Sequence, residues 1–256
     1  MVKKFARKFS EGKKCVYCGK YGFYRLRDKR VKCKHCRRAY SLLKLRKDLE
    51  ILYLFSLELS ARKTAKTLGL SYKPVYDRFG FYRELILQHC ESNFMKLSGE
   101  LELDETYFGG KRKGKRGRGA FNKQAVFGVL ERGGKAYIVP VPDVKKATLM
   151  EEIKNKTYTG SVFYTDCFKS YAGLRYYGKH KRINKKYAFA KGKNHINGVE
   201  SLWAFIKERM NKFHGVKMDN YYSYLKEMEF RFNNRDTNIY KQLFHITYNE
   251  FGTETT

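Results

Sequence analysis

The chain has 256 residues and carries 55 lysines and arginines against 25 aspartates and glutamates, so its formal net charge is +30 and its pI is near 9.8. Hydrophobic residues make up 42% of the chain and aromatic residues 16%, which excludes a disordered basic tail. The length allows one substantial core and one or two small modules. Such a charge predicts a polyanionic partner, and nucleic acid is favoured over an anionic membrane.

The sequence does not support the membrane and secretory classes. No stretch approaches the roughly 18 consecutive apolar residues of a spanning helix. The start, MVKKFARKFSEGKK, is basic, but no apolar segment follows it as in a secretory signal. We therefore expect a cytoplasmic protein whose residues 1–13 form a basic, mobile arm.

Two CxxC pairs, Cys15/Cys18 and Cys33/Cys36, mark residues 14–42 as a separate module. In a reducing compartment such pairs are typical of a tetrahedral structural zinc site. The segment has too few apolar side chains for a core of its own, so bound zinc would supply the folding energy. A redox motif and incidental cysteines are the alternatives, and the lack of a βαβ pattern around either pair disfavours the first. The other two cysteines, Cys90 and Cys167, are expected to be core residues.

The next segment, residues 43–98, has the 3–4 spacing of apolar residues that predicts helices. Ser60 is placed to cap a short helix from Ala61 to Leu68, Gly69 to end it, and Ser71 to cap the next helix. Glycine in a tight turn between two helices is typical of a helix-turn-helix, although an ordinary helical hairpin has the same pattern. The basic side chains around this turn favour DNA binding, and we assign contacts to Lys73 and Arg78.

From Gly99 onward the pattern becomes that of an α/β domain, which we predict over residues 99–256. Three strands, a helix, a fourth strand and further helices follow one another, which is the order of an RNase H-like mixed sheet. The expected strands are Leu101–Phe108, Ala125–Glu131, Ala136–Val141 and Ser161–Thr165, and the expected helices are Ala147–Lys156, Lys169–Leu174, Asn197–Phe213 and Asp219–Asn233.

Three acids in this domain have settings that indicate chemistry. Asp104 ends an apolar alternation and shares a strand face with Glu102. A strand rarely buries two acids on one face without a metal or a cation. Asp166 follows the β-type run Val162–Thr165, and Glu200 lies in a helical segment. Two carboxylates at strand ends and one on a helix suit a site where two divalent metals act on a phosphate ester.

Each acid also has a structural interpretation. Asp104 fits a solvated strand end, Asp166 fits an N-cap of the following helix, and Glu200 fits an intrahelical ion-pair surface that it would share with Lys207. His195 and Asn197 precede the helix of Glu200, and Asn197 is the better candidate for its N-cap.

The run KRKGKRGRG, from Lys111 to Gly119, contains no apolar side chain and three glycines. Runs of this kind are most often solvated loops. This one follows Asp104 closely, so it is also placed to clamp phosphates and to become ordered on DNA. The residues assigned to this role are Lys111, Arg112, Lys113, Lys115, Arg116 and Arg118.

Taken together, these motifs resemble the DDE-type insertion-sequence transposases of the ISXO-like group, over nearly the whole chain. VKCKHCRRAYSL resembles the zinc ribbon of that group, and residues 60–79 resemble its helix-turn-helix. Its catalytic blocks are similar to ELDETYFGGK, VFGVLER, VFYTDCFKSYAGL and NHINGVESLWAFIK, and its closing helix is similar to EFRFNNR. The first cysteine pair departs from the group in lacking a proline that such ribbons often carry.

The resemblance implies that Asp104, Asp166 and Glu200 are the catalytic acids and hold two Mg²⁺ ions, with Mn²⁺ as a substitute, and that Lys207 is the basic residue after the third acid. It implies a prokaryotic, nucleoid-associated enzyme that binds double-stranded DNA at terminal inverted repeats and at targets, and that cleaves and joins strands. A homo-oligomer assembled on DNA and one structural Zn²⁺ per chain are also implied. The alternatives are a non-catalytic DNA-binding regulator derived from such a transposase and a structure-selective nuclease of the same fold.

Overall fold

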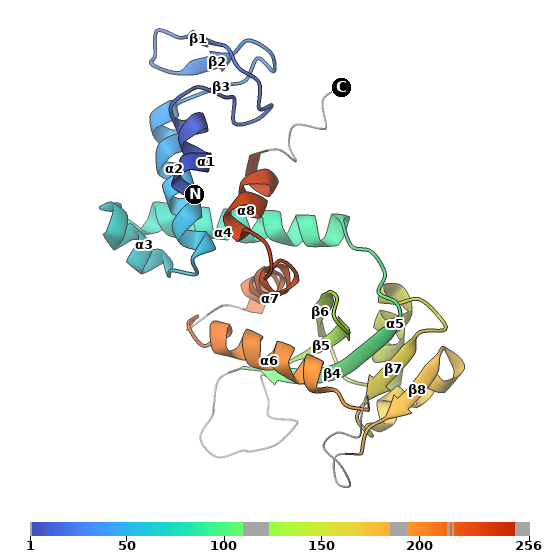
Figure 1. Cartoon of the computed structure of the whole chain (residues 1–256). Coiled ribbons are helices and arrows are strands. Elements are labelled where there is room, and N and C mark those ends of the chain that lie inside the picture. Colours follow the sequence, from blue (N-terminus) through green and yellow to red (C-terminus); the bar gives the residue numbers. More distant parts are fainter. Residues whose placement is uncertain (1, 110–122, 185–193, 214–215, 217, 249–256) are drawn as a thin grey trace. The chain divides into compact units, whose positions relative to one another are not determined.

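The computed structural model describes residues 2–109, 123–184, 194–213, 216 and 218–248. They form two compact units (Figure 1). The first combines the chain up to His89 with the C-terminal helix, and the second runs from Cys90 to Asn233. Among the described helices, none combines the length and the apolar character needed to cross a lipid bilayer.

The first unit begins with helix α1 (Val2–Ser10), where the sequence had predicted a mobile arm. Phe5 and Phe9 lie four residues apart and therefore share one face of this helix. Their ring centroids lie 5.1 and 4.7 Å from that of Phe244 in the C-terminal helix. The prediction of an arm was wrong because it weighed the basic residues and overlooked these two aromatic ones.

A small antiparallel sheet follows, in the strand order β1-β2-β3. Its strands are β1 (Phe23–Arg25), β2 (Val31–Cys33) and β3 (Ala39–Tyr40). The register pairs Phe23 with Cys33 and Val31 with Tyr40. Because β2 ends at Cys33, the sheet positions the second cysteine pair directly.

Three helices continue the unit, namely α2 (Leu42–Ser56), α3 (Ala61–Leu68) and α4 (Tyr72–Ser92). The predicted cap of α3 is confirmed, because the Ser60 hydroxyl accepts a hydrogen bond from the Lys63 N–H at 3.3 Å. Gly69, at φ 61°, ends this helix in the left-handed conformation that glycine adopts without strain. The start and the end of α3 therefore agree with the sequence prediction.

The C-terminal helix α8 (Ile239–Tyr248) packs on α2 and completes the first unit. The predicted boundary had placed this helix with the α/β domain. The apolar face of α8 packs on α2. In addition, Asp48 of α2 binds polar side chains from α8 and from α4. The Asp48 carboxylate accepts hydrogen bonds from the Tyr248 hydroxyl, from the Tyr82 hydroxyl at 2.7 Å, and from Arg78 Nε at 2.6 Å.

The second unit is built on a five-stranded sheet in the order β6-β5-β4-β7-β8. The strands are β4 (Glu100–Phe108), β5 (Gln124–Glu131), β6 (Ala136–Val141), β7 (Val162–Thr165) and β8 (Lys179–Arg182). β4, β5 and β6 are antiparallel, whereas β7 is parallel to β4 and β8 is parallel to β7. This is the strand order of an RNase H-like sheet, so the predicted fold class is confirmed. The sequence did not predict β8.

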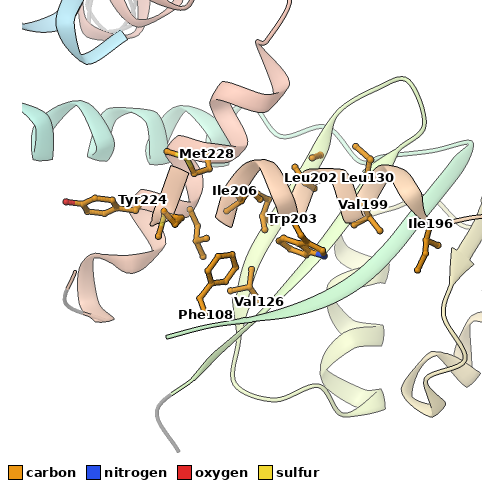
Figure 2. Packing of buried hydrophobic residues seen from close by; sticks show 14 of the residues in the cluster. Phe108, Val126, Leu130, Ile196, Val199, Leu202, Trp203, Ile206, Tyr224 and Met228 are labelled. Carbon is orange, nitrogen blue, oxygen red and sulfur yellow. The ribbon is translucent and has the colours of Figure 1, made fainter. Parts of the chain in front are cut away.

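Helices cover both faces of this sheet. On one face α5 (Lys146–Lys156) and the 3₁₀ helix η1 (Lys169–Tyr176) pack on Leu101, Leu103 and Phe163. On the other face lie α6 (Asn197–Met210) and α7 (Met218–Asn233), whose apolar side chains meet Phe108, Val126 and Leu130 (Figure 2). Since Leu101 and Leu103 point to the α5 face, Glu102 and Asp104 are directed to the α6 face.

Helix α7 also protects the outer edge of the sheet. The Asn233 side chain accepts from the Ala136 N–H at 2.7 Å and donates to the Ala136 carbonyl at 2.8 Å. The Glu229 carboxylate accepts from the Ile138 N–H at 2.7 Å. Side chains of α7 therefore bind three backbone groups at the edge of β6 that a further strand would otherwise bind.

Candidate active site and metal centre

The register of two parallel strands places Asp104 and Asp166 at corresponding positions along the chain. β4 pairs with β7 so that Glu100 lies beside Val162 and Glu102 lies beside Tyr164. Asp104 lies two residues beyond Glu102 in β4, and Asp166 lies two residues beyond Tyr164, directly after the end of β7. Both acids therefore follow the paired segment at its carboxyl end.

Helix α6 brings Glu200 to the same face of the sheet. Val199, Leu202, Trp203 and Ile206 are buried against the sheet, and Glu200 lies on the exposed side of the first turn. The helix approaches the backbone closely because Gly128, the strand partner of Asp104, has no side chain. A Cβ atom at that position would lie 2.6 Å from Trp203 Cζ2.

Glu102, buried on the same strand as Asp104, is paired with a cation, as expected for a buried acid. Its side chain is 1% exposed and accepts from Arg132 Nε at 2.8 Å. It also accepts from the Val199 N–H at 3.0 Å, in the first turn of α6. Arg132 lies in the turn between β5 and β6, and its Nη2 donates to the His195 carbonyl at 2.6 Å. Sequence reasoning identified the buried acid but not its partner, because nothing local connects residues 30 positions apart.

Two structural interpretations of the sequence can be compared with these contacts. Asp166 Oδ1 accepts from the Phe168 N–H at 2.8 Å, which stabilises the turn before η1, but Phe168 and not Asp166 occupies the N-cap position. Asn197 is not the N-cap of α6, which is Ile196 and makes no side-chain cap bond. Glu102 caps the helix from the neighbouring strand instead.

Among the described residues, the three acids do not form a group whose ligand atoms all lie within 4.8 Å of one another, whereas four cysteines do. Cys15 Sγ lies 3.6 Å from Cys36 Sγ, and Cys18 Sγ lies 3.7 Å from Cys33 Sγ. Four sulfurs at the usual Zn–S distance of about 2.3 Å would be roughly 3.8 Å apart in a tetrahedron. The cysteine cluster therefore has the size of a tetrahedral zinc site.

Burial raises the pKa of the Cys15 and Cys36 thiols, whereas the pKa of Cys33 is lowered. Burial opposes ionisation of Cys33, but hydrogen bonds from the N–H groups of Cys36 and His35 outweigh it and lower the pKa of the Cys33 thiol to about 7. Gly19 and Arg37 follow the two pairs at equivalent positions, with φ angles of 69° and 60°. Both turns thus adopt the same left-handed step after the second cysteine.

The isolated cysteines only partly fit the prediction. Cys90 is half-buried, but Cys167 is exposed, so the expectation of a core residue was wrong for Cys167. It follows Asp166 in the turn after β7, where the chain leaves the sheet.

The residues assigned to DNA contacts have different surroundings. Lys73 and Lys207 are exposed, and Lys73 Nζ pairs with Asp77 at 2.5 Å. Arg78 does not fit its assignment, because its guanidinium binds both carboxylate oxygens of Asp48 inside the first unit. The basic run with Lys111, Arg112, Lys113, Lys115, Arg116 and Arg118 lies outside the described residues.

Residues 96–233, more than half of the chain, match the model of the ISXO2-like transposase domain. The chain belongs to the ISXO2-like transposase family. An uncharacterized transposase-like protein of Haemophilus influenzae is 41% identical over 114 residues, which cover 43% of this chain and 93% of that protein. The match to the family domain takes in β4, β7 and α6, and with them all three acids.

Solved structures give more distant similarities to this ISXO2-like transposase. The catalytic core domain of HTLV-2 integrase in complex with magnesium is 12% identical, with 60% of this chain and 99% of that chain covered and a TM-score of 0.33. The Mos1 strand transfer complex is also 12% identical, with 77% and 73% covered and a TM-score of 0.33.

Proposed function

We propose that this protein is the transposase of an insertion sequence, which binds the terminal inverted repeats of its element and catalyses metal-dependent cleavage and transfer of DNA strands. The observation that supports the proposal is the register of β4 and β7, because Asp104 and Asp166 each lie two residues beyond its last pair, Glu102 with Tyr164. Family membership supports the same reaction.

Asp104, Asp166 and Glu200 would hold the divalent metals. Carboxylate oxygens are the ligands that Mg²⁺ prefers, and Mn²⁺ accepts the same set. Bound metal would supply Lewis acidity and an activated water or 3′-hydroxyl. The chain would contribute rigid positions on two paired strands and one packed helix, and three close carboxylates would repel one another without cations.

The first unit would recognise the DNA end. The exposed cations Arg62, Lys63, Lys66 and Lys73 surround the turn between α3 and α4, and the second helix of such a pair commonly enters the major groove. One zinc ion held by Cys15, Cys18, Cys33 and Cys36 would stabilise the ribbon, which directly precedes α2 in the sequence. We assign end recognition to this unit, catalysis to residues 90–233, and a homo-oligomer to the complex on DNA.

The decisive experiment measures Mg²⁺-dependent nicking of a labelled repeat-end duplex by the full chain. Asp104→Asn, Asp166→Asn and Glu200→Gln should each abolish nicking and joining while binding to the repeat persists. Glu105→Gln is the matched control, because Glu105 points to the opposite face, where it accepts from the Tyr171 hydroxyl at 2.9 Å.

The outcomes separate the candidate functions. Undiminished nicking by Asp166→Asn would remove the proposed site. Repeat binding by the unaltered chain without any nicking, in Mg²⁺ or Mn²⁺, would favour a regulator. Equal cutting of repeat and unrelated duplexes would favour a nuclease.

A further inference from the structure

We propose that Glu102 and Arg132 are positioning residues, which fix the first turn of α6 and with it Glu200 relative to Asp104 and Asp166. The inference rests on the proposed function, because the position of Glu200 matters to catalysis only if the three acids form one site. Neither residue is among the three acids, and each acts through the segment that it holds.

The buried Glu102 carboxylate divides its two oxygens between two segments. Oε1 accepts from Arg132 Nε at 2.8 Å, and Oε2 accepts from the Val199 N–H at 3.0 Å. The N–H groups in the first turn of a helix have no partner within the helix, and the helix dipole favours a negative charge there. Glu102 therefore anchors the start of α6 to the strand that carries Asp104.

Arg132 joins the start of α6 to strands β4 and β7. Its Nη2 donates to the His195 carbonyl at 2.6 Å, and its guanidinium lies 3.7 Å from the ring centroid of Tyr164 in β7. The Tyr164 hydroxyl in turn donates to Glu100 Oε1 in β4 at 2.7 Å. A planar guanidinium can stack on a ring and donate in two directions at once, which a lysine ammonium cannot do.

These bonds hold the helix on both sides of its first residue. His195 lies before the start of α6 and Val199 within its first turn, directly before Glu200. The N-cap residue of α6 makes no side-chain bond that could replace them. Close approach is essential, because a Cβ atom at Gly198 would lie 2.8 Å from Glu102 Oε2.

A purely structural ion pair would have similar burial, so the test needs a matched control. Glu229 of α7 is 2% exposed and also accepts from a backbone N–H, that of Ile138 at 2.7 Å, and from a cation, Lys226 Nζ at 2.8 Å. It lies at the outer edge of β6, in the same unit. Glu229→Gln therefore removes an equivalent buried carboxylate without touching the start of α6.

The experiment compares Glu102→Gln, Arg132→Lys and Glu229→Gln in the full-length protein. Amide hydrogen exchange is followed in the peptide that covers residues 196–203, and nicking of the repeat-end duplex is titrated with Mn²⁺. The first two variants should exchange faster in this peptide and lose about 10–100-fold in nicking rate or in apparent Mn²⁺ affinity, as is usual when groups that orient metal ligands are changed. Their affinity for repeat DNA should stay unchanged. Glu229→Gln should alter neither exchange in this peptide nor the Mn²⁺ dependence.

Unaltered exchange of residues 196–203 in Glu102→Gln would overturn the proposal, and so would an equal change in Glu229→Gln. If Glu102→Gln does not fold, the same measurements on Arg132→Lys and Gly198→Ala test the proposal, because both variants keep the buried carboxylate. Should the unaltered protein fail to nick DNA, the proposed function is lost, while the exchange measurement still shows whether the pair holds α6.

Discussion

Gly128 shows how a single missing side chain sets the distance between a helix and the sheet. Trp203 occupies the space above it, so Gly128→Ala would force the indole or the helix to move. We expect a loss of about 1–3 kcal/mol in the free energy of unfolding, as in other overpacked cores. Urea unfolding monitored by tryptophan fluorescence measures this directly, since Trp203 is the single tryptophan of the chain.

The matched control is Gly80→Ala in helix α4. Nothing lies within 4 Å of a Cβ atom at that exposed helical position. Alanine there should raise stability by about 0.5–1 kcal/mol, because glycine is a poor helix former. The same substitution is thus expected to lower the free energy of unfolding at Gly128 and to raise it at Gly80. A change in the same direction at both sites would contradict the packing that we describe.

The surroundings of His180 predict that the stability of the folded state depends on pH. Burial and then the positive charge of Arg182 lower its pKa below the usual value, and its Nε2 lies 2.9 Å from Thr165 Oγ1. The folded state therefore binds fewer protons than the unfolded state, so this contribution to stability is present above the unfolded pKa near 6.5 and is lost as the pH falls below it. Comparing melting temperatures at pH 8 and pH 5.5, we expect a smaller fall for His180→Gln than for the unaltered protein.

Among single residues, the sequence predicted those that stand in a recognisable local pattern. Alternation put Asp104 and Glu102 on one strand face, and a β-type run ended at Asp166. The partner of Glu102 had no such signal, since Arg132 sits in a turn and meets Glu102 only when β4 and β5 pair. The helix cap also came from another element, so no pattern around Asn197 could reveal it.

Among the elements, the small sheet β1-β2-β3 with the cysteine cluster should depend most on a bound metal. Its three strands are two or three residues long, so they cannot supply a core without the cysteine cluster. Cys33→Ser combined with Cys36→Ser should reduce bound zinc from one per chain to none, measured by elemental analysis of the purified protein. Cys167→Ser, which changes an exposed cysteine outside the cluster, should leave one zinc per chain. Full zinc content in the double variant would exclude the site.

The edge of β6 gives a second prediction for an element. Asn233→Leu would leave the N–H and carbonyl of Ala136 without the partners that they now have. An unsatisfied buried backbone group costs about 1–3 kcal/mol, so we expect a clear loss of stability in urea. Asn155→Leu, an exposed position at the end of α5, should change little. Similar losses at both positions would argue against a role for α7 in covering this edge.

The sequence predicted most elements because their apolar spacing was strong, as in α6 and β5. It missed β8, whose residues Lys179–Arg182 are all basic or histidine, because pairing with β7 and not side-chain burial makes this segment a strand. It missed α1 for the opposite reason, since charge obscured two aromatic residues. Tertiary contacts decided both segments.

For the whole molecule, the net charge of +30 predicts binding to DNA that is sensitive to salt. A protein that makes six to ten phosphate contacts loses about 10³–10⁵ in affinity between 50 and 200 mM salt. Lys66→Met and Lys73→Met should each lower the slope of log affinity against log salt by about one unit. Arg78→Met should leave the slope unchanged and lower stability instead, because Asp48 binds this side chain. A lower slope for Arg78→Met would restore it as a DNA contact.

The first unit is discontinuous, because its helices need α8 from the other end of the described chain. During synthesis, at roughly 5–20 residues per second, the ribbon and α2 to α4 leave the ribosome on the order of ten seconds or more before α8 does. In that interval Asp48 lacks Tyr248, and the aromatic face of α1 lacks Phe244. A nascent chain would therefore complete its N-terminal unit only after the strands and helices between have been made. A stop codon just after residue 233 would spare every strand of the RNase H-like sheet and damage the unit that was synthesised first.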